Sequence, residues 1–242
     1  MDVQGYIIRI TPYSEADGIV TLLTSDGNIS FYGRSIFKIA SKNAVAIQPY
    51  HFVEVSLIES KTGKNRYTLK RAELLSGLEP IIKDITAMSA LFTLGEIFNK
   101  LIIEKEDARA VYPYFDKGVQ AIKSGFDPLT SILIFFAATL RIIGYGIEIS
   151  SCVNCGSKKD IIGVSALEGG LICKNCRALE YTIYDSLSIN IIRYIFMVPA
   201  EKYTHTSFKK EVLLPILSGL RAYTYDIIGT RFKTIDDFLK IL

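Results

Sequence analysis

The sequence predicts an α+β fold in which a small five-stranded β-barrel precedes an α-helical domain that is interrupted by a four-cysteine ribbon. Three observations predict it: short β-branched and aromatic runs in the first part of the chain, helical spacing from about Glu79 onward, and two Cys-x-x-Cys pairs. The 242 residues, 49% of them hydrophobic, are enough to build real cores. We expect a barrel at 1–79, a helical domain at 80–149 and 181–242, and the ribbon as an insert at 150–180.

The barrel is predicted from five short runs that are rich in β-branched and aromatic residues. Turn signals separate the runs, and Asp26-Gly27-Asn28 has the composition of a hairpin turn. Five strands in so short a segment suit a small closed barrel of the OB type, and an SH3-like barrel has nearly the same pattern. The expected strands are Tyr6–Ile10, Ile19–Thr24, Ile29–Tyr32, Phe52–Ile58 and Arg66–Ala72.

The helical domain is predicted from apolar residues at three- and four-residue spacing. Asp84 can cap the first helix. Asp127 at a cap position and Pro128 at the first helical position mark the start of the third helix. The other helical patterns lie at about 108–123, from 187 past Pro199 to 228, and from 236.

The four cysteines are the most informative motif of the chain. Cys152 and Cys155 form one pair, Cys173 and Cys176 form the other, and the 17 residues 156–172 separate them. This spacing is typical of a tetrahedral zinc site with four thiolate ligands. Because four thiolates close the coordination sphere, we expect one structural Zn²⁺ that performs no chemistry.

Two other interpretations of the cysteines remain open. Two disulfides would require an oxidising compartment, and the residues after Met1 show no secretory signal. A thioredoxin-like redox pair normally has a single motif.

The longest apolar stretch ends at Arg141 and is too short to span a bilayer, so we expect a cytoplasmic protein without a membrane partner.

Positive charge is concentrated in the second half of the predicted barrel. The window 34–71 has eight lysine and arginine residues against two glutamates, a net charge of +6, whereas the whole chain carries only +3. A helical turn would align the first three basic residues, and strand alternation sends Arg66 and Lys70 to one side. Such a groove can follow a phosphate backbone, although a solvated face with edge-strand lysines explains the charge equally well. The candidate nucleic-acid-binding residues are Arg34, Lys38, Lys42, Lys64, Arg66, Lys70 and Arg71.

Two further groups of side chains have both a functional and a structural interpretation. Most barrel aromatics are expected in the core, but Tyr32 and Phe37 flank Arg34 and are candidate platforms for base stacking. Basic residues also surround the cysteines, where we expect them to compensate the net negative charge of a four-thiolate site. These are Lys158, Lys159, Lys174 and Arg177.

Motifs that support catalysis are missing from the sequence. There is no Walker-type phosphate loop, no dinucleotide-binding glycine motif, no nucleophile elbow and no HExxH helix. The two histidines lie in different predicted domains and have no adjacent nucleophile motif. We therefore expect a protein that is not an enzyme.

The order of these parts resembles the bacterial RecO family over essentially the full length of the chain. The most specific match is the cysteine signature, in which Gly169-Gly170 precedes the second pair. Weaker matches lie in the barrel and the helices. They are Glu15-Ala16-Asp17, Gly33-Arg34, Gln48-Pro49-Tyr50, Leu94-Gly95-Glu96-Ile97 and Leu140-Arg141-Ile142-Ile143-Gly144.

The resemblance implies an OB-fold domain, a helical domain and a zinc finger. It implies binding of single- and double-stranded DNA, annealing of complementary strands, and cooperation with RecR to load the RecA recombinase. It also implies a contact with the C-terminal tail of the single-strand-binding protein, and no nucleotide hydrolysis. The residues alone leave two alternatives open, a protein-interaction scaffold and an RNA-binding factor with an OB barrel and zinc ribbon.

Overall fold

The computed structural model describes residues 1–59, 66–178, 182–203 and 208–242. The chain forms two compact units. The first contains Met1–Asp84 and Ile102–Tyr112, and the second contains Ile85–Leu101 and Pro113–Leu242.

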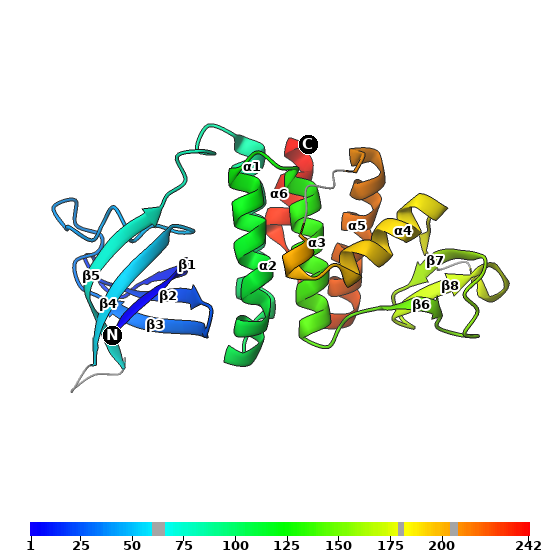
Figure 1. The fold of residues 1–242 in the computed structure, drawn as a ribbon, viewed down its shortest axis with the longest axis horizontal. Helices are drawn as coiled ribbons and strands as arrows, with labels where there is room; N and C mark the ends of the chain where they lie inside the picture. Colours follow the sequence, from blue (N-terminus) through cyan, green and yellow to red (C-terminus); the bar gives the residue numbers. More distant parts are fainter. Residues whose placement is uncertain (60–65, 179–181, 204–207) are drawn as a thin grey trace. The chain divides into compact units, whose positions relative to one another are not determined.

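The first unit contains a closed barrel of five strands (Figure 1). Their order around the barrel is β1-β2-β3-β5-β4, and the antiparallel pairing of β1 with β4 closes it. This order is that of the OB fold, so the OB prediction is confirmed. The strands are β1 (Asp2–Pro12), β2 (Gly18–Thr24), β3 (Gly27–Gly33), β4 (Phe52–Glu59) and β5 (Tyr67–Ser76).

Alternating burial along β4 contributes one side of the barrel core. In β4, Val53, Val55 and Leu57 are buried while the residues between them are partly exposed. Phe31 of β3 is fully buried in the same core. The period of two therefore specifies the inward face of β4, whereas β1 and β2 bury consecutive residues.

The second unit is built around one fully buried helix. In the described part of the chain there are six helices, and every residue of α3 from Leu129 to Leu140 is buried. Asp127 caps α3 by accepting from the backbone N–H of Thr130 at 2.9 Å, as predicted. No described helix combines the length and apolarity needed to cross a membrane. The helices are α1 (Ile85–Leu101), α2 (Lys105–Lys123), α3 (Pro128–Ile142), α4 (Ser186–Met197), α5 (Lys210–Ile228) and α6 (Lys233–Ile241).

The cysteine ribbon belongs to the second unit and lies between α3 and α4 in sequence (Figure 1). Its strands form a four-stranded sheet in the order β6-β8-β7-β9. The strands are β6 (Glu148–Cys152), β7 (Ile161–Ser165), β8 (Gly170–Cys173) and β9 (Thr182–Ile183).

A long-range cap holds the last helix of the second unit. The first residues of α6 have no capping side chain of their own, because Phe232 occupies the N-cap position. The carboxylate of Glu96 in α1 replaces it, accepting from the backbone N–H of Thr234 at 2.8 Å and from its hydroxyl at 2.6 Å. Burial raises the pKa of Glu96, but the hydrogen bonds from Thr234 and Lys100 outweigh it and lower that pKa overall. Glu96 therefore ties the C-terminal helix to α1.

We predict that Glu96→Ala lowers the free energy of unfolding of the helical unit. The loss should be about 1–2 kcal/mol, because removal of an N-cap acceptor leaves helix N–H groups unsatisfied. Urea unfolding followed by circular dichroism measures it. Glu201→Ala, which removes an exposed glutamate of the same unit, is the matched control. Equal denaturation midpoints for the two variants would contradict the capping role.

Candidate metal centre and nucleic-acid interface

The ribbon brings the four predicted cysteine ligands together. Cys152 ends β6 and Cys173 ends β8, and these two strands are parallel neighbours, so the two cysteine pairs meet at one end of the sheet. Gly156, with a φ of 72°, closes the first turn and donates its N–H to the carbonyl of Cys152 at 2.8 Å. The four sulfur atoms lie within 4.8 Å of one another.

This geometry fits a single tetrahedral ion. A zinc–sulfur distance of about 2.3 Å places the sulfurs of a regular tetrahedron about 3.8 Å apart. The sulfurs of Cys155 and Cys173 are 3.6 Å apart. The cysteine cluster can therefore hold a metal such as zinc, as the spacing predicts, without a large rearrangement.

The electrostatics of the thiols favour a cation at the cluster centre. Burial opposes ionisation of Cys152, but backbone N–H groups that include those of Cys173 and Cys155 lower its pKa to about 6. The hydrogen bond between Cys176 and Cys155, together with burial, raises the pKa of Cys176 to about 12. Four adjacent sulfurs therefore cannot all ionise by themselves, and a divalent ion supplies the charge that lets them do so.

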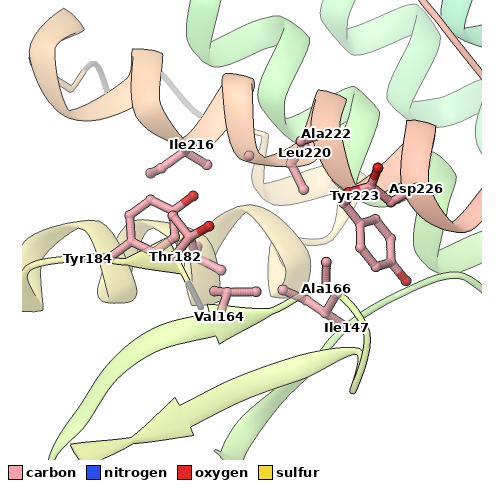
Figure 2. Close-up of a pocket in the computed structure, with 12 residues that line it drawn as sticks. Ile147, Val164, Ala166, Thr182, Tyr184, Ile216, Leu220, Ala222, Tyr223 and Asp226 are labelled. Carbon is pink, nitrogen blue, oxygen red and sulfur yellow. The ribbon is translucent and has the colours of Figure 1, made fainter. Parts of the chain in front are cut away.

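A small pocket with both polar and apolar lining residues marks the place where the ribbon meets the helices. Its volume is about 150 Å³, and it lies between α5 and the ribbon (Figure 2). Ile216 and Leu220 line the α5 side, and Val164 lines the ribbon side. Beside it, the hydroxyl of Tyr184 donates to the carbonyl of Pro215 at 3.4 Å. These contacts attach the metal-site ribbon to the helical bundle.

The predicted DNA-binding residues that the structure describes are all exposed on the barrel unit. Lys64 lies outside the described residues. The parallel pairing of Tyr32 with Thr68 joins the end of β3 to the first part of β5. Because the two strands run in the same direction, Arg34 and Lys70, which each follow the paired residue by two positions, lie toward the same end of the barrel. The exposed residues are Arg34, Lys38, Lys42, Arg66, Lys70 and Arg71.

One detail of the basic region differs from the sequence expectation, and a second could not be predicted from the sequence. Residues 34–51 form turns and contain no helix, so a helical turn does not align Arg34, Lys38 and Lys42. The pairing of β5 with β4 shifts register beside Lys70, and this bulge lets Lys70 and Arg71 both point outward. A bulge of this kind leaves no signal in the alternation of a single strand.

Two of the basic side chains have acidic neighbours. Arg66 lies 3.6 Å from Glu59 and Arg71 lies 2.7 Å from Glu73. All four side chains are more than half exposed, so these ion pairs contribute little stability and can be exchanged for phosphate contacts.

The turn that carries Arg34 is clasped by a carboxylate that no local sequence pattern indicates. Asp17 accepts a hydrogen bond from the backbone N–H of Ser35 at 2.6 Å and a second one from the hydroxyl of Tyr32. Ser35 has a φ of 54°, a left-handed conformation that costs energy in a residue other than glycine. Asp17 therefore holds a strained turn next to Arg34. The partners are 15 and 18 residues away, which is too far for a capping or turn motif to reveal them.

Tyr32 is consequently not a free aromatic platform. It is partly buried, and its ring meets that of Tyr13 edge to face at 5.8 Å. Phe37, the other candidate, is 43% exposed.

We predict that the Asp17 clasp makes barrel stability depend on pH. The hydroxyl of Tyr32 and the N–H of Ser35 hold the pKa of Asp17 below its ordinary value of 3.8. A carboxyl group whose pKa is lower in the folded state stabilises the fold at pH values above its ordinary pKa. This stabilisation is lost as the pH falls through the folded-state pKa. Asp17→Asn should therefore show a smaller loss of unfolding free energy than the wild type between about pH 4 and pH 2.

The measurement is urea unfolding at a series of pH values. Glu15→Gln removes an exposed carboxylate of the same loop and is the matched control. Identical pH profiles for Asp17→Asn and the wild type would show that the clasp does not contribute.

This chain is similar in sequence to known proteins over nearly its whole length. Residues 1–78 match the family model for the N-terminal domain of recombination protein O, and residues 82–234 match the model for its C-terminal domain. The DNA repair protein RecO of Bacillus pumilus is 30% identical over 176 residues, which cover 72% of this chain and 67% of the relative. The DNA repair protein RecO of Exiguobacterium sibiricum is 28% identical, and the match covers 81% of this chain and 78% of the relative. The DNA repair protein RecO of Bacillus subtilis is 23% identical, and the match covers 96% of this chain and 91% of the relative.

The fold and the site define a class: proteins in which an OB barrel is joined to a helical domain with a four-cysteine ribbon. The two family models together cover nearly the whole chain. The chain belongs to the RecO family, and the resemblance seen in the sequence is confirmed.

Proposed function

We propose that this protein is a non-catalytic mediator of DNA repair that binds DNA through its barrel and anneals complementary single strands. The observation that carries the proposal is the exposed basic surface of an OB barrel in a chain of the RecO family. Its residues are those predicted from the sequence: Arg34, Lys38, Lys42, Arg66, Lys70 and Arg71, with Lys64 as a further candidate.

The physical requirements of annealing support this role. Two strands repel each other through their phosphates, and a surface that brings them together must screen that charge without reading sequence. Exposed lysine and arginine side chains provide this screening, because counterions leave the DNA as the side chains bind. Neither the screening of the phosphates nor the pairing of the two strands needs a nucleophile, a general base or a bound nucleotide.

The metal in this proposal is one structural Zn²⁺ held by Cys152, Cys155, Cys173 and Cys176. The ion would supply folding energy to a ribbon whose own apolar core is small. With four thiolate ligands it has no open position for a substrate.

The family membership supports the choice of partners. We propose RecR and the C-terminal tail of the single-strand-binding protein as direct partners, in addition to single- and double-stranded DNA. The RecA recombinase is an indirect partner, loaded onto strands that the single-strand-binding protein coats.

An annealing assay tests the proposal. Complementary labelled oligonucleotides coated with single-strand-binding protein should anneal faster when the purified protein is added, without any nucleotide cofactor. An annealing rate equal to the spontaneous one would reject a role as an annealing mediator. Binding of RNA in preference to DNA in a competition experiment would instead support the RNA-binding alternative.

A further inference from the structure

We infer that the barrel site recognises unpaired bases, and that the rings of Tyr13 and Phe37 are the surfaces on which they stack. This inference rests on the proposed function and names its ligand class, single-stranded nucleic acid with accessible bases. Tyr13 is 68% exposed and Phe37 is 43% exposed. By contrast, Phe31 is fully buried in the barrel core and Tyr6 is 4% exposed.

The two exposed rings are held by the same pair of connected loops. The backbone N–H of Phe37 donates to the carbonyl of Ala16 at 3.0 Å, and that of Tyr13 donates to the carbonyl of Asp17 at 2.9 Å. The loop between β1 and β2 is therefore fastened to the turn that follows β3. In OB folds the loop between the first two strands belongs to the surface that binds oligonucleotides.

Each ring is supported from one side and accessible on another. The Tyr13 ring packs edge to face on Tyr32, whose hydroxyl is fixed by Asp17. Phe37 lies over Gly18, where an added Cβ would come within 3.2 Å of the Phe37 ring. Because each ring already packs against a neighbour, we expect it to lose less conformational freedom than an unsupported ring when a base stacks on it.

The charges around the rings suit a nucleic-acid strand. Arg34 and Lys38 are exposed within the turn that carries Phe37, and they can contact the phosphates on either side of a stacked base. Asp17 and the exposed Glu15 of the neighbouring loop carry negative charge, which the hydrogen bonds from Tyr32 and Ser35 to Asp17 do not remove, so we expect the phosphates on the side of Arg34 and Lys38. Aromatic rings flanked by cations are the usual composition of sites for single strands.

Base stacking should add to the affinity of the protein for a single strand and should not add to its affinity for a duplex. Bases in a duplex are stacked inside the helix, so they do not reach protein rings. The test compares a short labelled oligothymidylate with an abasic strand of equal length, which keeps every phosphate but has no bases. Fluorescence anisotropy gives the affinity of the full-length protein for each strand.

The wild type should bind oligothymidylate at least about tenfold more tightly than the abasic strand, since stacking contributes about fivefold or more for each base and two rings are available. The double variant Tyr13→Leu/Phe37→Leu should lose this preference and keep its affinity for the abasic strand. Tyr13→Trp retains an aromatic ring and should retain the preference. Tyr145→Leu removes an exposed ring of the helical unit and should have no effect.

The outcomes separate this inference from the function on which it rests. Equal affinity of the wild type for the two strands, or an unchanged preference in the double variant, would overturn base stacking while leaving phosphate binding intact. Failure of the wild type to bind either strand at moderate salt would overturn the proposed function as well. A double variant that no longer binds the abasic strand would show that the rings support the fold rather than the bases.

Discussion

Removal of the proposed zinc ion should unfold the cysteine ribbon and leave the barrel folded. The ribbon's buried cluster consists of Cys152, Ile172 and Cys173, which is too small to hold four short strands together without a cross-link. Structural zinc contributes about 10 kcal/mol or more to the folding of comparable small domains. Chelation, or Cys173→Ser, should therefore abolish amide protection between residues 148 and 176.

Hydrogen exchange followed by mass spectrometry measures this loss for each part of the chain. The strands β1 to β5 belong to a separate unit, so their protection should be unchanged. Asn154→Ala alters a residue between two ligands without removing a sulfur, and it should retain both metal and protection. A ribbon that stays protected after the metal is removed would show that β6 to β8 do not depend on it.

Reversal of three barrel charges should weaken the binding of single-stranded DNA more than the reversal of exposed charges in the helical unit or the ribbon. The variant combines Arg34→Glu, Lys38→Glu and Arg66→Glu, all at exposed positions of the barrel unit. If each side chain neutralises one phosphate, the slope of log affinity against log salt should decrease in magnitude by about 2, or about 0.7 per lost contact. Anisotropy titrations at several salt concentrations give both the affinity and the slope.

The ribbon provides the control for charge. Lys158 is exposed next to the cysteine cluster, and Lys158→Glu should change the affinity for DNA much less than the triple variant does. The opposite ranking would move the DNA-binding surface from the barrel to the ribbon.

The parts of the fold with strong local signals could be predicted from the sequence. The β-branched runs specify five strands, and the spacing of Cys152, Cys155, Cys173 and Cys176 specifies a cluster that the structure confirms. Strand order could not be predicted, because the parallel pair of β3 with β5 depends on contacts between residues far apart in the chain. It is this pair that distinguishes the OB barrel from the SH3-like alternative.

The details of the candidate DNA site depend on long-range contacts and were therefore missed. The expected alignment of Arg34 with Lys38 on a helical turn was wrong, because the segment folds as turns clasped by Asp17. The exposure of the Tyr13 side chain could not be predicted, because an aromatic residue next to a strand usually packs in the core. The capping of α6 by Glu96 spans 138 residues and is likewise invisible to local patterns.

The salt dependence of single-strand binding by the wild-type protein tests whether the basic side chains of the barrel bind phosphates. A barrel that neutralises roughly four phosphates should give a slope of about −3 for log affinity against log salt. A slope near zero, or no binding at moderate salt, would contradict the account of the exposed basic side chains as a surface for DNA.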